Sequence, residues 1–199
     1  MPNSTFYVCS YGGSGSTMLC NYLKQYGQSF HIHSRNPPDK LEYTGTIHGG
    51  NAHHEHFNGI KIPDSKINQY KVIFIYKNPI KSIYSIFKNP NHLKHIELPH
   101  MINFDKVIEE KKDLYRITEF YNNYVNNKNK NKNYKIYCIK YEDLFENMHV
   151  LHNVLGLPPI KNKLIKREKV REEPDKDILE YIYKDLLSEM KQNDFIMVK

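Results

Sequence analysis

A glycine- and hydroxyl-rich run near the start of the chain has the composition of an anion-binding turn. It follows the β-branched and aromatic stretch 5–9 and precedes an apolar pattern typical of a helix. Glycines let the backbone curl closely around an anion, and the free N–H groups at a helix start attract phosphate. A plain turn followed by a serine N-cap would contain the same residue types. The run consists of Gly12, Gly13, Ser14, Gly15, Ser16 and Thr17.

The place of this run, between an expected strand and an expected helix, favours anion binding over the plain turn. A nucleotide-hydrolysing P-loop would need GxxxxGK[ST], whereas the residue after Gly15 is Ser16 rather than lysine. ATPases, GTPases and ordinary kinases are therefore disfavoured.

A second candidate site follows the most apolar stretch of the chain. Lys77 comes directly after residues 71–76, and Pro79 stands where a helix can begin without losing a needed hydrogen bond. Ser82 and Ser85 are spaced to share one face of that helix. A cation at a strand end and a hydroxyl on the next helix can converge on one phosphate. A capped helix with surface lysines would show the same residues.

The elements that must position these sites alternate between strand and helix. Such alternation predicts right-handed crossovers and a three-layer α/β/α fold with a mainly parallel central sheet, here as a single domain over residues 1–199. Ligands bind such sheets at the carboxyl ends of the strands, where both candidate sites fall. We expect strands at 5–9, 30–33, 44–48, 71–76 and 134–140, and helices from 16 to a stop at Gly27 and at 79–87, 104–125, 144–155 and 175–190.

Three segments in this order resemble the sulfotransferase family that uses 3′-phosphoadenosine 5′-phosphosulfate (PAPS). The first strand with its Gly/Ser turn looks like the family's 5′-phosphosulfate-binding loop. The segment from Lys77 to Ser85 looks like its 3′-phosphate-binding segment, in which a serine follows the strand-end cation by eight positions. Residues 140–144, Lys-Tyr-Glu-Asp-Leu, are similar to the family's Tyr-Glu-Asp-Leu segment. Residues 155–158, Leu-Gly-Leu-Pro, fall where the family often has Leu-Gly-Leu.

The resemblance implies a P-loop NTPase-like fold and transfer of a sulfuryl group from PAPS to a hydroxyl or amine, leaving adenosine 3′,5′-bisphosphate. It assigns the phosphosulfate to the Gly/Ser turn, the 3′-phosphate to Lys77 and Ser85, and the adenine to Tyr141. Arg167 and Arg171 fall where many relatives place a basic loop over the 3′-phosphate. A solvated charged linker explains these two arginines equally well.

Two departures from the family pattern affect the expected chemistry. The family usually carries a basic residue at the position of Gly13, where it stabilises charge on the departing phosphate oxygen. Either another cation replaces it, with Arg35, Lys81 and Lys24 as candidates, or turnover is slow or absent. Lys77 in place of arginine keeps the charge but loses the bidentate fork. A pseudoenzyme that binds the cofactor without transferring sulfate is therefore an alternative.

The acceptor's proton needs a base, and histidine is the usual choice near neutral pH. His48 fits the family's histidine between the two phosphate-binding segments, and His33 fits one that follows the second strand. With 11 histidines in the chain, either is also explained as an ordinary surface or core residue. The cluster His53, His54 and His56 lacks helical spacing and acidic partners, so no metal site is expected.

The formal net charge of +7 suits a cofactor or partner rich in phosphate or sulfate. Much of the excess lies in the polar run 126–135, which we interpret as a solvated loop. Nucleic acid is thus disfavoured, although a polyanion-binding protein without the cofactor pocket stays open. The chain lacks long insertions that would roof a small pocket, which favours an open cleft for a glycan or polypeptide acceptor. Oligomeric state is left open.

The sequence shows neither a membrane-spanning run nor a signal peptide, and this bears on the cellular compartment. No apolar run reaches the length of a membrane span, and residues 1–5 lack the layout of a signal peptide. We therefore expect a cytoplasmic, soluble chain with no membrane partner. Cys9, Cys20 and Cys138 have no disulfide or zinc spacing and are expected to be buried thiols.

Overall fold

The computed structural model describes residues 4–37, 42–43, 51–53, 60–61, 64–87, 102–126, 132–160, 162–166 and 172–199. For His33, Phe87 and the short strands at 42–43, 51–53 and 60–61 it describes the backbone alone.

A six-stranded sheet forms the centre of the protein, in the order β4-β2-β1-β6-β7-β8. All neighbouring strands run parallel except β7 and β8, which pair antiparallel. The prediction of an α/β fold with a mainly parallel sheet is therefore confirmed. The strands are β1 (Ser4–Cys9), β2 (Gly27–His33), β4 (Asn51–His53), β6 (Tyr70–Tyr76), β7 (Ile136–Lys140) and β8 (Ile196–Val198), and β3 (Glu42–Tyr43) pairs with β5 (Ile60–Lys61) apart from this sheet.

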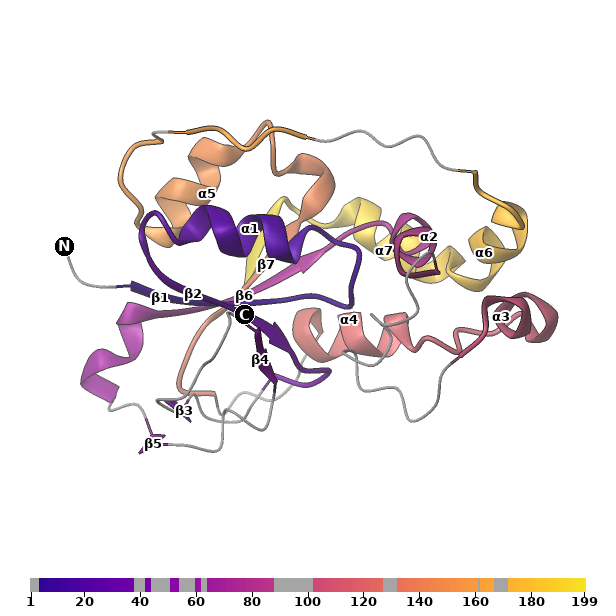
Figure 1. The fold of residues 1–199 in the computed structure, drawn as a ribbon, viewed down its shortest axis with the longest axis horizontal. Helices are drawn as coiled ribbons and strands as arrows, with labels where there is room; N and C mark the ends of the chain where they lie inside the picture. The colour runs from indigo at the N-terminus through magenta and orange to yellow at the C-terminus, as the bar shows by residue number, and fades with distance from the viewer. Residues whose placement is uncertain are drawn as a thin grey trace.

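Helices lie on both faces of the sheet, with α1 and α5 on one face and α4 on the other (Figure 1). One apolar core is built around Phe74, Phe120 and Tyr124, with the rings of Phe74 and Tyr124 stacked 4.5 Å apart. The other core includes Leu19 of α1 and Leu151 of α5. The helices are α1 (Ser16–Leu23), α2 (Pro79–Phe87), α3 (Phe104–Glu110), α4 (Ile117–Val125), α5 (Met148–Leu155), α6 (Lys176–Ile182) and α7 (Lys184–Gln192), with short 3₁₀ turns η2 (Asp64–Gln69) and η4 (Tyr141–Asp143).

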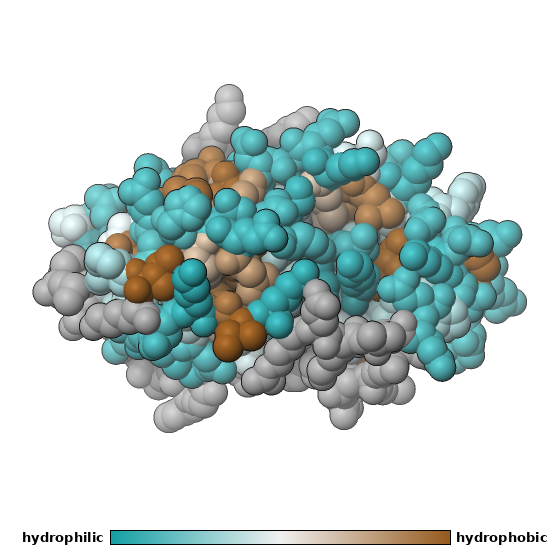
Figure 2. All heavy atoms as spheres, turned by 90° about the horizontal axis from the view of Figure 1, so that it is seen from above, coloured by the Kyte–Doolittle hydropathy of each residue, from teal (hydrophilic) through white to brown (hydrophobic). Residues whose placement is uncertain are grey.

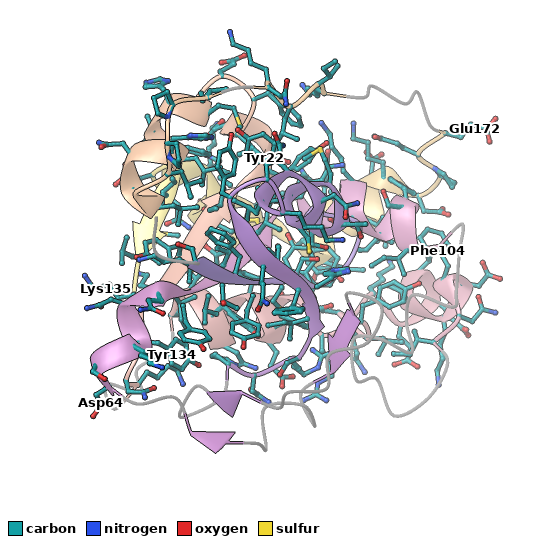
Figure 3. All side chains as sticks on the ribbon, turned by 60° about the vertical axis from the view of Figure 1, so that its left-hand side comes forward. Tyr22, Asp64, Phe104, Tyr134, Lys135 and Glu172 are labelled. Atoms are coloured by element: carbon teal, nitrogen blue, oxygen red, sulfur yellow. The ribbon has the colours of Figure 1, made fainter. Side chains whose placement is uncertain are left out.

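The two ends of the sheet lie at opposite ends of the molecule. Asp64, Tyr134 and Lys135 precede β6 and β7 in the chain and lie at one end, whereas Phe104 and Glu172 lie at the other (Figure 3). The carboxyl ends of these strands therefore point toward the end that carries α2, α3 and α6.

The single long helix expected at 104–125 is wrong, because the chain forms two helices there. Lys111 and Arg116 adopt left-handed conformations, with φ of 51° and 53°. The carboxylate of Asp113 accepts hydrogen bonds from the backbone N–H groups of Ile117 and its successor, at 3.0 and 2.8 Å. This carboxylate caps a new helix start, which favours a break over continuation.

The other elements agree with the sequence prediction only in part. The helix 79–87 is confirmed, whereas the single helix expected at 175–190 is wrong because it breaks at Tyr183 into α6 and α7. Gly27 does not stop a helix but begins β2, where its backbone packs against Ser4 of β1 so closely that a Cβ would meet the Ser4 oxygen at 2.0 Å. The strands β3, β4, β5 and β8 were not anticipated, and the expected strand 44–48 lies outside the described residues.

The surface over α1 and α5 is mostly hydrophilic, with apolar areas separated by polar ones (Figure 2). Within the described ranges, no helix has the length and apolar character needed to cross a bilayer. The three cysteines are buried and unpaired by disulfides, as expected.

Candidate functional site

The carboxyl ends of β1 and β6 form a topological switch point of the sheet. From β1 the chain passes through α1 to β2 on one side, whereas from β6 it passes to β7 on the other side. Connections that leave two adjacent parallel strands in opposite directions open a crevice at their carboxyl ends, and ligands commonly bind there. Residues 10–16 follow β1 and Lys77 follows β6, so both candidate sites of the sequence meet at this crevice.

The Gly-rich turn presents an unbroken row of backbone donors. Gly12, Gly13 and Gly15 have φ values of 93°, 66° and 80°, which L-residues with side chains rarely adopt. Within the described part of the chain, the N–H groups of residues 13–18 donate no hydrogen bond, and α1 has no side-chain cap. The first backbone acceptor used by α1 is the Gly15 carbonyl, bonded to the Leu19 N–H at 3.0 Å. Free donors at the positive end of a helix suit an anion.

The three segments that resemble the family meet around this turn. A Cβ on Gly15 would lie 2.5 Å from Cε2 of Tyr141, so the Tyr141 ring packs directly on the turn. The Lys77 ammonium lies over the same ring, 4.8 Å from its centroid. A Cβ on Gly13 would lie 2.9 Å from the Cβ of Ser85. The turn, Lys77, Ser85 and Tyr141 thus form one cluster.

Tyr11 holds the backbone of Lys77 in place. Its hydroxyl donates to the Lys77 carbonyl and accepts from the Lys77 N–H at 2.9 Å. Tyr11 is fully buried, and burial raises its pKa well above the usual value, so the hydroxyl keeps its proton. The side-chain oxygen of Asn78 caps α2 by accepting from the N–H of Ile80 at 2.9 Å.

Glu142 links the segment after β6 to the segment after β7. Its carboxylate accepts from the N–H of Asn78 at 2.9 Å. This bond ties the residues after β6 to those after β7, so the positions of Lys77 and Tyr141 are coupled.

The serines of the cluster mostly bond to nearby backbone. Ser85 donates to the Lys81 carbonyl at 3.0 Å, and Ser14 donates to the Gly12 carbonyl at 3.1 Å. Ser82 is fully buried with its hydroxyl 3.4 Å from that of Ser14, so it faces the turn from α2. Ser85 therefore lies near the turn, but its hydroxyl donates its proton to the backbone of α2.

His31 is a residue of the site that sequence reasoning missed. Its Nε2 lies 2.8 Å from the Ser16 hydroxyl, which accepts from the Ser10 hydroxyl at 2.9 Å. The signal was present in the alternation His31-Ile32-His33, because alternate residues of a strand share one face. The backbone of His33 ends β2, whereas the other predicted base, His48, lies outside the described residues.

The three residues named as possible substitutes for a basic side chain at position 13 lie in different surroundings. Arg35 is buried beneath the sheet, where it donates to the Arg116 carbonyl at 2.8 Å and lies over the Phe120 ring. Lys24 follows the C-terminal end of α1, the end opposite the turn. Lys81 is exposed on α2. Neither Arg35 nor Lys24 is positioned to act at the turn, and Arg167 and Arg171 lie outside the described residues.

Comparison with family models, curated proteins and solved structures finds no match for this chain. Among the residues with described placement, no group of three or more metal-ligating side chains is close enough to hold an ion. The His53 side chain, His54 and His56 lie outside this set.

Proposed function

We propose that this chain is a PAPS-dependent sulfotransferase whose α/β fold is of the P-loop NTPase-like kind. The observation that carries the proposal is the convergence of the Gly-rich turn, Lys77 and Tyr141 at the switch point of the sheet. Each of these resembles a different cofactor-binding segment of the family. A simple turn with a serine N-cap would explain none of this convergence.

The residues present suit the phosphate-bearing parts of such a cofactor. The free N–H groups of residues 13–18 would hold the 5′-phosphosulfate at the positive end of α1. Lys77 would pair with the 3′-phosphate, and Tyr141 would stack on the adenine. The Lys77 ammonium lies over the Tyr141 ring. Adenine could stack on that face of the ring only if the ammonium moved away from the ring. The 3′-phosphate would give the ammonium its new partner.

When bound, PAPS supplies an activated sulfuryl group, and the protein must remove a proton from the acceptor. Among the described histidine rings, that of His31 is the one hydrogen-bonded to the turn, through Ser16. His31 is therefore our preferred base, ahead of the sequence candidates His33 and His48. General bases must lie within hydrogen-bond reach of the proton they remove, directly or through one water.

A second candidate function, cofactor binding without transfer, is favoured by the packing around Gly13. A Cβ there would lie 2.8 Å from the Ser82 carbonyl oxygen, so the position has no space for a long basic side chain. Arg35 and Lys24 do not reach the turn. Of the three cation candidates Lys81 is left, and it is exposed on α2. Without a cation at residue 13 itself, the charge on the departing phosphate oxygen falls mainly to backbone N–H groups. Such a protein would bind adenosine 3′,5′-bisphosphate and release it unchanged.

The first experiment tests the nucleotide site shared by both candidates. Thermal unfolding is measured with adenosine 3′,5′-bisphosphate or ATP on the native chain, on Lys77→Ala, on Ser85→Ala and on Lys66→Ala, an exposed control on η2. A ligand at 100 times its dissociation constant should stabilise the fold by about 2.7 kcal/mol. We expect the bisphosphate to stabilise the native chain and Lys66→Ala, but Lys77→Ala and Ser85→Ala much less.

Equal stabilisation by ATP, or an unchanged response of both site variants, would refute the family assignment. Stabilisation by a polyanion alone would favour the polyanion-binding alternative. Transfer of radiolabelled sulfate from PAPS to glycans, peptides and phenols then separates the enzyme from the pseudoenzyme.

A further inference from the structure

A pocket of about 320 Å³, apart from the Gly-rich turn, opens beside the carboxyl ends of β6 and β7. Its volume lies at the lower end of the range for small-molecule sites, roughly 300–1,000 Å³. Figure 1 shows α2 and α7 next to each other in this region. The lining residues come from both helices and from the strand ends, and they are Tyr76, Asn78, Lys81, Lys140, Glu142, Leu187, Met190 and Lys191.

One residue that lines the pocket, Tyr76, carries a buried polar atom without a hydrogen bond. Tyr76 is fully buried, and its hydroxyl has no hydrogen-bond partner in the described structure. The nearby amide of Asn193 donates to the Tyr121 hydroxyl, and its proximity to Tyr76 lowers the pKa of Tyr76. Burial is the larger effect and raises that pKa, so the hydroxyl stays a donor. A buried donor without a partner is costly unless a ligand or water satisfies it.

The polar side of the pocket carries an excess of positive charge. The ammonium of Lys140 pairs with Asp143 at 3.3 Å, and the carboxylate of Glu142 accepts from the Asn78 N–H. Lys81 and Lys191 form no ion pair with any residue whose placement is described. Two ammonium groups without an ion pair among the described residues, beside the apolar side chains of Leu187 and Met190, suit a ligand with an apolar body and one anionic group.

The pocket is distinct from the Gly-rich turn, since none of residues 12–17 lines it. Ser82 and Ser85 of α2 face the turn, where they pack on Gly13. Lys81 of α2 and Asn78, the residue before the helix, line the pocket instead. Tyr76 and Tyr141 also belong to different apolar cores, on opposite faces of the sheet.

We propose that this pocket binds a small apolar or aromatic anion, with Lys81 and Lys191 on its charged group and the Tyr76 hydroxyl on an acceptor atom of the ligand. A ligand reaches the hydroxyl only if a lining side chain moves, since Tyr76 is covered. Met190 lines the pocket and is suited to that movement, because its unbranched side chain adapts easily. The site does not depend on the proposed transferase function.

The test uses 2-naphthoate as the probe and measures its dissociation constant by isothermal titration calorimetry. Neutral 2-naphthamide and inorganic phosphate serve as ligand controls. Lys191→Gln should weaken naphthoate binding roughly tenfold, and Tyr76→Phe roughly two- to tenfold, from the usual strength of such hydrogen bonds. Lys184→Gln removes the same charge from an exposed position of α7 outside the pocket and should leave the constant unchanged.

Stability measurements make the Tyr76 result specific. Because the hydroxyl has no partner, Tyr76→Phe should leave the midpoint of thermal unfolding unchanged or raise it, while binding weakens. A lowered midpoint would show that the hydroxyl is already satisfied and would overturn its role.

Three other outcomes would overturn the proposal. The first is no heat of binding with naphthoate at millimolar concentration. The second is equal loss of affinity in Lys191→Gln and Lys184→Gln, or equal binding of naphthamide or phosphate. The third is displacement of naphthoate by adenosine 3′,5′-bisphosphate, which would place the probe at the Gly-rich turn. Independent binding of the two compounds supports a separate site.

Discussion

The packing of Tyr141 on the Gly-rich turn can be tested by comparing two glycines that share a backbone conformation. Gly15 and Gly156 have φ values of 80° and 65°, so alanine at either position is held in the left-handed region, at about 1–2 kcal/mol. Their surroundings differ. A Cβ on Gly156 meets nothing within 4 Å, whereas a Cβ on Gly15 meets Tyr141 at 2.5 Å. Overpacking of this kind adds roughly 1–3 kcal/mol.

We therefore expect Gly15→Ala to lower the free energy of unfolding by about 2–5 kcal/mol and Gly156→Ala by about 1–2 kcal/mol, both measured by urea titration. Gly15 also stands at the N-cap of α1, where alanine is less favourable than glycine. Combining Gly15→Ala with Tyr141→Ser isolates the ring contact, because the smaller side chain should recover the steric part of the loss. Equal losses at the two glycines, or no recovery in the double variant, would show that the ring does not rest on the turn.

Three further predictions concern buried or half-buried polar groups. Asp113→Ala should lower the free energy of unfolding by about 2–4 kcal/mol, because it removes the cap of α4 and the acceptor of the Tyr183 hydroxyl at 2.6 Å. Asp105→Ala, at an exposed position, is the control in the same urea titration. An equal loss in the two variants would contradict the capping role. Burial raises the pKa of Tyr84 and Tyr115 to about 12 in the folded protein, above the value of 10.0 expected in the unfolded chain. The free energy of unfolding should therefore be highest below pH 10 and should fall as the pH rises from 10 to 12. Melting points at pH 9 and 11 check this, and equal midpoints would contradict it. Cys138 is buried, and burial raises its pKa to about 12. Its thiol should therefore react with a disulfide reagent only when the chain unfolds in denaturant. A fast reaction of the native protein would contradict this burial.

The parts of the fold that the sequence predicts well are those where one local pattern decides the outcome. The continuous apolar run 72–76 favours a strand buried on both faces, and β6 occupies the centre of the sheet. Pro79 starts α2 at the expected residue. The break between α3 and α4 depends instead on Asp113, which also receives the Tyr183 hydroxyl from a segment 70 positions away. Such a partner is visible only in three dimensions.

The candidate site divides in the same way. The Gly-rich turn could be predicted because left-handed glycines and a helix start leave a sequence pattern, and Lys77 because it ends the most apolar strand. His31 could not be preferred over His33, since both share the face of β2 and their distinction depends on the position of Ser16. The pocket beside α7 was also invisible, because the predicted single helix 175–190 gave no reason to place Lys191 near Tyr76.

Gly13 connects the departure from the family pattern to the packing of α2. In the sequence, glycine at this position suggests only that a cation has been lost. In the structure, the Ser82 carbonyl oxygen and the Ser85 Cβ would lie 2.8 and 2.9 Å from a Cβ at residue 13. Helix α2 thus occupies the space through which a basic side chain would leave the backbone, and the φ of 66° adds strain for any such residue. Glycine at residue 13 and the close approach of α2 are one structural feature, so placing a lysine at residue 13 would require α2 to move as well.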